Sequence, residues 1–233
     1  MNPAATLTAA YAEADARAAF IRKTYAHLAG ALALFAGLEY LLITSPLGEQ
    51  IAGFVFSARY GFLMLLGGFI LTGWLARGFA QRIDSPAAQY AGLILYVLAQ
   101  AVIFVPLIYM AVFYSSPDLL QNAALLTGFL FAGLSAVCFI TRKDFSFLRG
   151  ILAIGGMVAL GLIVCSILFG FTLGLAFSAG MILLACTAIL YDTSKVIHHY
   201  PVGSHVAASL ELFASVALLF WYVLRLLMSL NRR

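Results

Sequence analysis

The chain has 233 residues, of which 64% are hydrophobic and only 9% charged, and its mean hydropathy is +1.04. Soluble domains are about half apolar and a quarter charged, so this composition excludes an ordinary soluble domain and indicates an integral membrane protein. The formal net charge of +4 is small. Its basic residues lie in short loops without interleaved aromatic side chains, which argues against nucleic-acid binding.

Apolar segments of spanning length recur along the chain and predict an all-α, polytopic membrane fold. Seven spans of about 21 residues would use roughly 147 residues, close to what the apolar segments supply. Six spans is the alternative count, because only residues 170–172 separate the fifth segment from the sixth. The expected spans cover residues 24–43, 60–76, 87–113, 119–140, 147–168, 173–191 and 206–227.

No composition shift marks a second folded domain. We expect a polar, partly helical cytosolic tail over residues 1–20 and one transmembrane domain over residues 21–233. Residues 45–48 (SPLG) break the chain after the first span, whose ends are marked by His27 and Glu39. Both of these side chains are expected at the membrane interfaces.

The fifth span contains three glycines that predict close contacts with a neighbouring helix, Gly155, Gly156 and Gly161.

Basic residues in short loops predict the orientation of the spans. One side of the membrane would carry Arg17, Arg22, Lys23, Arg77, Arg82, Arg142, Lys143, Arg149 and Lys195, and the other Arg59, Arg225, Arg232 and Arg233. The first set is larger, so the N-terminus is expected in the cytoplasm. Seven spans then put the C-terminus outside, which disagrees with the terminal arginine pair. A re-entrant final segment would remove this disagreement and stays open as an alternative.

The stretch over residues 181–211 contains the ionisable residues that are hardest to accommodate in a membrane. Asp192 closes the sixth span, and Glu211 lies about five residues, or roughly 8 Å, into the seventh. Carboxylates at such positions are costly in lipid and indicate a functional site. Ser215 lies one turn deeper on the same face as Glu211. The two carboxylates could meet and share a proton, because like charges disfavour joint ionisation. Such a pair would form a pH-sensitive latch or a cation site.

A structural role for Asp192 is the alternative: it could lie among lipid headgroups and pair with Lys195 at i,i+3. A negative charge at a helix C-terminus opposes the helix dipole, so helix propensity alone would not place it there. His198, His199 and His205 are expected to be solvated loop residues that could tune a latch near neutral pH.

Enzyme motifs are incomplete. The Tyr191-Asp192 pair is similar to half of an aspartyl intramembrane protease site, but the partner Gly-x-Gly-Asp motif is missing. Residues 133–136 (GLSA) are similar to a rhomboid-type serine site, yet no histidine lies deep in another span to act as its base. HExxH, Walker and dinucleotide motifs are lacking. The three cysteines lie inside apolar segments without metal-site or disulfide spacing. The sequence therefore indicates a protein that is not an enzyme and takes no cofactor.

Three short motifs, FIRKTY at 20–25, TRKDFSFL at 141–148 and ILYDTS at 189–194, occur in order at the ends of predicted spans. With them the chain resembles the Bax inhibitor/YccA superfamily, whose eukaryotic members are called the transmembrane Bax inhibitor motif proteins. The resemblance covers essentially the whole chain. It implies a seven-helix fold in which six helices surround a central last one.

Some members of this superfamily are described as pH-dependent calcium leaks that use one aspartate on the sixth helix and another on the seventh. Asp192 matches the first of these. Ser215 stands where the second belongs, and a serine hydroxyl cannot supply the second anion. Glu211, one turn away, is the candidate substitute, and Arg77 is the candidate for the latch arginine of the leak members. The metal that such a site would hold stays open.

Members without the second aspartate resemble the bacterial YccA branch. Those inner-membrane proteins bind and modulate the membrane protease FtsH, partly through a cytosolic N-terminal tail, and residues 1–20 suit that role. The resemblance therefore implies a non-enzymatic FtsH modulator in the lipid bilayer. The alternative is a pH-sensitive leak for Ca²⁺, H⁺ or another cation, gated by carboxylates at the cytoplasmic ends of the last two spans.

Overall fold

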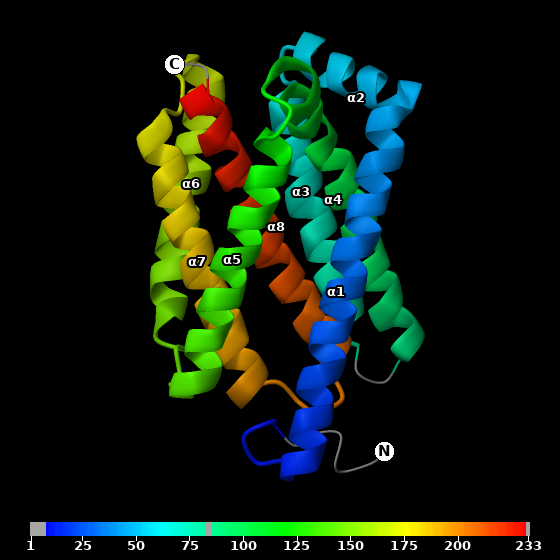
Figure 1. Ribbon diagram of the computed structural model, residues 1–233, viewed down its shortest axis with the longest axis vertical. Helices are drawn as coiled ribbons and strands as arrows, with labels where there is room; N and C mark the ends of the chain where they lie inside the picture. Colours follow the sequence, from blue (N-terminus) through cyan, green and yellow to red (C-terminus); the bar gives the residue numbers. More distant parts are fainter. Residues whose placement is uncertain (1–7, 83–84, 232–233) are drawn as a thin grey trace.

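The computed structural model describes residues 8–82 and 85–231, and within these ranges it contains eight α-helices joined by short turns (Figure 1). The helices are α1 Ala14–Thr44, α2 Pro46–Ser57, α3 Gly61–Ala80, α4 Pro86–Tyr114, α5 Leu119–Thr141, α6 Leu148–Phe169, α7 Leu175–His198 and α8 His205–Asn231. All of them except α2 are long and apolar enough to cross a membrane. The prediction of an all-α fold with seven spans is confirmed.

The last helix, α8, runs through the middle of the bundle and packs against α1, α3, α4, α5 and α7 (Figure 1). Buried side chains occur on all of its faces, as they do on any helix that neighbours surround. More than half of its spanning segment (56%) is buried, whereas only 6% of the peripheral α6 is. The expectation of a central last helix is therefore confirmed.

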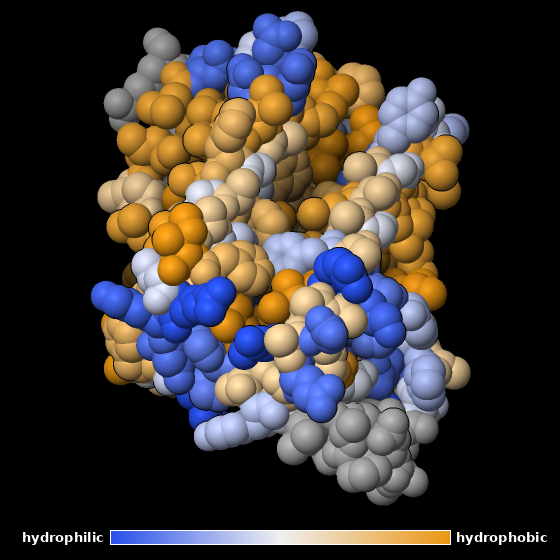
Figure 2. Space-filling view, turned by 60° about the horizontal axis from the view of Figure 1, so that its bottom comes forward, coloured by the Kyte–Doolittle hydropathy of each residue, from blue (hydrophilic) through white to orange (hydrophobic). Residues whose placement is uncertain are grey.

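The two ends of the chain lie at opposite ends of the bundle (Figure 1). The loops α3–α4, α5–α6 and α7–α8 lie at the N-terminal end, where hydrophilic side chains gather, while the sides above it are largely hydrophobic (Figure 2). α8 is one continuous helix as far as Asn231, so the re-entrant final segment is not found. The arginine pair at 232–233 lies outside the described residues.

The break expected at residues 45–48 is a corner that leads into a helix that the sequence analysis did not anticipate. Ser45 is extended, as the residue before a proline usually is, and Pro46 opens α2. With 12 residues, α2 is only about 18 Å long, too short to span a bilayer. It lies across the end of the bundle (Figure 1), with Gly48, Ala52 and Val55 on its buried face.

At two places the helices continue past the apolar segments that define the expected spans. α1 begins at Ala14, ten residues before the expected start at 24, and α7 ends at His198, seven residues after the expected end at 191. Asp192 therefore lies inside α7. Glu39, which was expected at a membrane interface, is enclosed by protein. This side chain is only 6% exposed, and both carboxylate oxygens lack a hydrogen-bond partner among the described residues.

The glycine prediction was only partly correct. A Cβ atom at Gly155 would lie 2.6 Å from Leu184 Cδ1, so this glycine does face a neighbouring helix, but Gly156 and Gly161 face open space. At Gly92 of α4 the backbone of one span approaches the backbone of another. A Cβ atom there would lie 2.6 Å from the Ala76 carbonyl oxygen of α3. Helices α3 and α4 therefore touch through their backbones one residue from Arg77.

We expect Gly92→Ala to lower the free energy of unfolding by about 1–3 kcal/mol, because the added methyl must push two helix backbones apart. Thermal unfolding of the purified protein in detergent measures this loss. Gly78→Ala, on α3 with open space around its Cβ position, is the matched control and should leave stability unchanged or slightly higher. Equal effects of the two changes would contradict the close-contact argument.

Candidate functional site

Asp192 of α7 is buried against the central helix, with only 7% of its surface exposed. The Ser215 hydroxyl of α8 donates a hydrogen bond to its Oδ2 atom at 2.6 Å. Burying a carboxylate removes its hydration, so it needs donors from the protein. Ser215 supplies one, and Asp192 and Ser215 together join α7 to α8.

A second pair lies one helical turn away on α8. The Arg77 guanidinium of α3 donates from Nε to Glu211 Oε1 at 2.8 Å. The Arg77 side chain is 40% exposed and that of Glu211 21%, so this ion pair faces the open end of the bundle. The Arg77 Cζ atom also lies 6.0 Å from the centre of the Tyr96 ring on α4, within range of a cation–π contact. The pair thus joins α3 and α4 to α8.

The structure brings together all four residues nominated from the sequence, but it pairs them differently from the expectation. Asp192 binds Ser215, and Glu211 binds Arg77; among the described residues no hydrogen bond joins the two carboxylates. The shared proton is therefore not the arrangement found. Nor do the ion pairs of the described segments include Asp192 with Lys195. The Lys195 ammonium instead lies 5.2 Å from the centre of the Tyr191 ring.

Tyr200, in the loop between α7 and α8, covers this end of the site. Burial raises the pKa of Tyr200 above its ordinary value, and the nearby charges of Glu211 and Asp192 raise it further. The phenol therefore stays protonated at neutral pH. Its backbone carbonyl accepts a hydrogen bond from Ala9 N at 2.9 Å, beside an antiparallel bridge between Thr8 and Pro201. The N-terminal segment is thus fastened to the loop that joins the two carboxylate-bearing helices.

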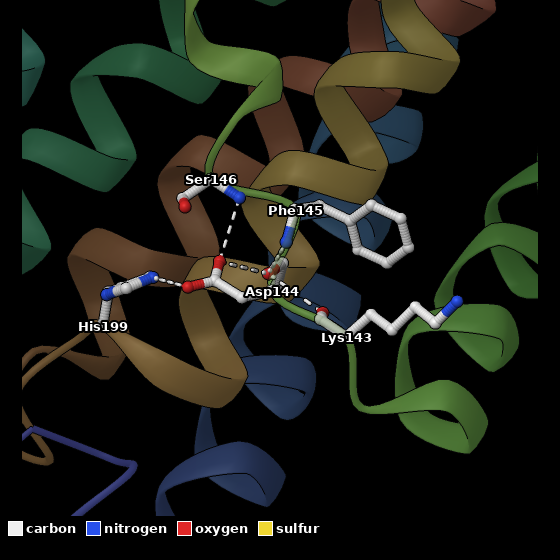
Figure 3. A network of polar contacts seen from close by, with 6 residues as sticks. Lys143, Asp144, Phe145, Ser146 and His199 are labelled. Carbon is white, nitrogen blue, oxygen red and sulfur yellow. Dashed lines mark hydrogen bonds and ion pairs between the residues drawn. The ribbon is translucent and has the colours of Figure 1, made fainter.

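A second polar cluster lies where the α5–α6 loop meets the end of α7 (Figure 3). The carboxylate of Asp144 accepts a hydrogen bond from Ser146 N at 2.9 Å and lies 3.0 Å from His199 Nε2. The Ser194 hydroxyl accepts from Phe145 N at 2.9 Å. These contacts hold the loop containing the TRKDFSFL motif against the helix that contains the ILYDTS motif.

Several residues that make these polar contacts were not predicted from the sequence. Asp144 lies in the TRKDFSFL motif but was not predicted to be a site residue. Its position two residues before Ser146 is a local signal for a turn in which the aspartate side chain accepts a backbone hydrogen bond. His199 was expected to be solvated, and although it is exposed it binds Asp144. His198 and His205 are helix residues rather than loop residues, at the end of α7 and the start of α8. Tyr96 carries no local signal of its contact with Arg77.

The site as arranged offers few metal ligands. Among the described residues, no three His, Cys, Asp or Glu side chains are grouped closely enough to hold a metal ion. Ca²⁺ takes six to eight oxygen ligands. Here the Asp192 carboxylate is buried and hydrogen-bonded to a serine, and the Glu211 carboxylate is paired with an arginine. A cation could gain both carboxylates only if the ion pair between Arg77 and Glu211 opened.

Seven spans, the last of which is central and carries part of a buried polar site, define a polytopic membrane protein. Residues 17–232 match the family model described as "Inhibitor of apoptosis-promoting Bax1". Because this match covers nearly all of the sequence, the chain belongs to the Bax inhibitor family, which confirms the resemblance found in its motifs.

The chain is also similar to individual proteins of bacteria and yeast. An uncharacterized protein of Pseudomonas aeruginosa is 37% identical over 110 residues, covering 47% of this chain and 49% of the relative. The Escherichia coli protein named "Modulator of FtsH protease YccA" is 37% identical over 102 residues, covering 43% of this chain and 46% of that protein. Bax inhibitor 1 of Schizosaccharomyces pombe is 27% identical over 219 residues, covering 91% and 76%. The matches to the two bacterial relatives thus span about half the length of each.

The Asp144 cluster predicts a pH effect on stability. Partial burial raises the pKa of Asp144, but the Ser146 N–H and the nearby His199 outweigh this effect, so the net pKa is lowered. A lowered pKa stabilises the fold above the unfolded-state pKa of about 3.9 and loses that contribution as pH falls through the folded-state value. Asp144→Asn should therefore cost about 1 kcal/mol or less at neutral pH, since both partners are nearly half-exposed. The difference from wild type should vanish in acid.

Unfolding temperatures across a pH series provide the measurement. Asp118→Asn, which removes an exposed carboxylate at the opposite end of α5, is the control and should show no such pH-dependent difference. A stability gap for Asp144→Asn that persists unchanged below about pH 3 would contradict the assignment.

Proposed function

We propose that this chain is a non-enzymatic membrane protein that binds and modulates an FtsH-type membrane protease. The observation that carries the proposal is its 37% identity, over 102 residues, to the E. coli protein named as a modulator of that protease. The shared family and the full set of seven spans support it. We further propose that the protein resides in a bacterial inner membrane with its N-terminus in the cytoplasm, since most basic residues lie at that end.

The N-terminal segment is the proposed point of contact. It is fastened through Ala9 to Tyr200 and leads into α1 at the polar end of the bundle. A protease that engaged this segment would also act on the α7–α8 loop. Through that loop it would reach the helices that carry Asp192 and Glu211.

A non-enzymatic role fits the surroundings of the two protease-like residues. Asp192 is bonded to a serine rather than facing a second aspartate. Ser135 is buried on α5, and its hydroxyl has no hydrogen-bond partner, histidine or otherwise, in the described part of the chain.

Reconstitution tests the proposal directly. The purified full chain and FtsH would be placed together in liposomes, and the rate at which FtsH degrades a membrane substrate would be compared with and without the chain. A changed rate is expected. An unchanged rate, with the two proteins shown to share the same vesicles, would rule out modulation.

The contact segment is tested by deletion. Removing residues 2–7 leaves Thr8, Ala9 and α1 in place, so insertion and folding should be unaffected. If the protease engages these leading residues, the deletion should lengthen the lifetime of the chain in cells containing FtsH. Removing residues 2–19 should have at least as large an effect. Pulse-chase turnover measures both, with cells containing inactive FtsH as the control, where all lifetimes should match. Unchanged turnover of both deletion variants would contradict the proposal that the protease contacts the N-terminal segment.

A pH-sensitive cation leak is the second candidate function. The observation that favours it is the pair of contacts by which α8 is held at the polar end: Ser215 with Asp192, and Glu211 with Arg77. Protonating a carboxylate weakens an ion pair or a charge-assisted hydrogen bond. Lower pH would therefore loosen α8 from α3 and α7 and open this end of the bundle.

For the leak, we expect Asp192→Asn to abolish the pH dependence of calcium or proton flux in liposomes between about pH 5 and 8. Glu211→Gln should also alter it, because the variant leaves Arg77 without its anion. Ser215→Asp should increase calcium passage by adding a second carboxylate. Ser215→Ala serves as the control that removes the hydroxyl without adding charge. If the wild-type protein passes no ion in this pH range and Ser215→Asp adds no calcium flux, the leak proposal is wrong and the protease-modulator proposal is left.

A further inference from the structure

A large cavity lies in the half of the bundle opposite to Asp192, at the end that contains the C-terminus of α8. Its volume is about 660 Å³. Helices α3 and α4 form one side and α6 and α7 the other, with α8 as the floor. None of the four nominated residues lines it. Its volume falls within the range of about 300–1,000 Å³ that is typical of ligand sites.

The cavity is lined mainly by apolar side chains, with Gln100 and Ser166 among them, and opens toward the surface that the bilayer surrounds. Leu66 and Phe69 of α3 face Ala159 and Ile163 of α6 across it. Leu160, halfway along α6, lines the cavity and remains 42% exposed. An opening at that depth, between two spanning helices, gives access to lipid rather than to water.

One end of the cavity is polar and positively charged. Arg225 of α8 lines it together with Ser229 and Thr172. The Arg225 guanidinium donates from Nη2 to the Leu173 carbonyl at 3.3 Å. The ion pairs of residues 8–82 and 85–231 do not include it. A cation bonded to a neutral carbonyl at the mouth of an apolar cavity retains donors for an anion.

We propose that this cavity binds an anionic phospholipid from the leaflet that surrounds the C-terminal end of α8. One acyl chain lies between α3 and α6, and the phosphate binds Arg225. This inference is independent of the protease and leak proposals, because it uses neither the polar end of the bundle nor the N-terminal segment.

The dimensions favour a lipid chain over a helix of a partner protein. The lining residues on α8 run from Ala214 to Ser229, a length of roughly 22 Å at 1.5 Å per residue. Helices α3 and α6, which border the cavity, also contact each other, so a helix about 10 Å across has no room to lie between them. A slender hydrocarbon chain fits this length, and a phosphate matches the Arg225 guanidinium at the mouth.

Photocrosslinking in nanodiscs tests the proposal. The full chain would be placed in phosphatidylcholine nanodiscs containing a minor share of phosphatidylglycerol with a photoreactive group in its acyl chain. Crosslinks are expected on residues 156–167 of α6 and 214–229 of α8, and unlabelled phosphatidylglycerol should compete better than phosphatidylcholine. Crosslinks spread evenly over the outward faces of α1, α5 and α6 would mean ordinary surrounding lipid and would overturn the proposal.

Two variant pairs test the headgroup and the chain separately. Arg225→Gln should lower the preference for phosphatidylglycerol over phosphatidylcholine in the cavity by about ten-fold, the contribution of one direct charge-assisted hydrogen bond to the anionic headgroup. Arg59→Gln removes the same charge at the same end of the bundle but outside the cavity, so it should change nothing. Gly156 lines the cavity, and a Cβ atom there would meet open space. The variant Gly156→Phe should therefore fill the cavity with its aromatic ring and remove the crosslinks.

Gly161→Phe, on the same helix but outside the cavity lining, is the matched control and should retain the crosslinks. Each variant must first keep the wild-type unfolding temperature, so that lost binding is not lost folding. If the two arginine variants behave alike, the phosphate assignment is wrong. If the two glycine variants behave alike, the chain does not enter the cavity.

Discussion

The hydrogen bond from Ser215 to Asp192 has consequences for the whole bundle because of where it lies. In a bilayer, apolar helix faces gain little by leaving lipid for protein, so apolar contacts alone specify the rotation of a helix weakly. A buried carboxylate without a donor is costly in any rotation. The central helix supplies the donor to α7 and, one turn away, the carboxylate that binds Arg77 of α3. Turning α8 by one residue would lose both contacts, so these two pairs fix its orientation.

The other polar features at this end extend the same constraint outward. Backbone contact at Gly92 brings α3 and α4 together beside Arg77. Tyr200 covers the site from the connecting loop and holds the N-terminal segment through its carbonyl. Asp144 and Ser194 attach the α5–α6 loop to α7. The opposite half of the bundle has no comparable network among its described residues, and it is there that the cavity lies. One half is thus held by directional contacts and the other by apolar packing.

Some features of the fold could be predicted from the sequence and others could not, depending on which physical constraint determines each feature. Span number could be predicted, because the thickness of a bilayer dictates the length of an apolar segment. Helix ends could not, since α1 and α7 continue into polar residues that hydropathy cannot separate from a loop. The short α2 was missed because 12 residues of mixed character match no spanning pattern. The central place of α8 was expected only from the family resemblance, since its composition does not differ enough from that of other spans.

The candidate site shows the same division. Asp192 and Glu211 could be found because charge is rare in apolar segments, whereas Arg77 was nominated only through the family resemblance. Their partners could not be assigned, since a difference of a few ångströms decides whether Glu211 meets Asp192 or Arg77. Asp144 with His199, and Arg77 with Tyr96, join residues far apart in the chain and leave no local trace. Glu39 was expected at the interface because it lies near a helix end, but nothing in the local sequence indicates that its neighbours bury it.

The central place of the last helix also bears on how the protein is made. Chains emerge N-terminus first, so the six outer spans enter the membrane before the helix that they will surround exists. Until then Asp192 lacks Ser215, Arg77 lacks Glu211, and the faces of five helices that will bury α8 meet lipid or one another. The nascent bundle must keep an interior place open, or reopen it, for a segment that is made after all six of them. Quality control that senses unpaired charge within the membrane would therefore distinguish a finished bundle from one that lacks only the 27 residues of α8.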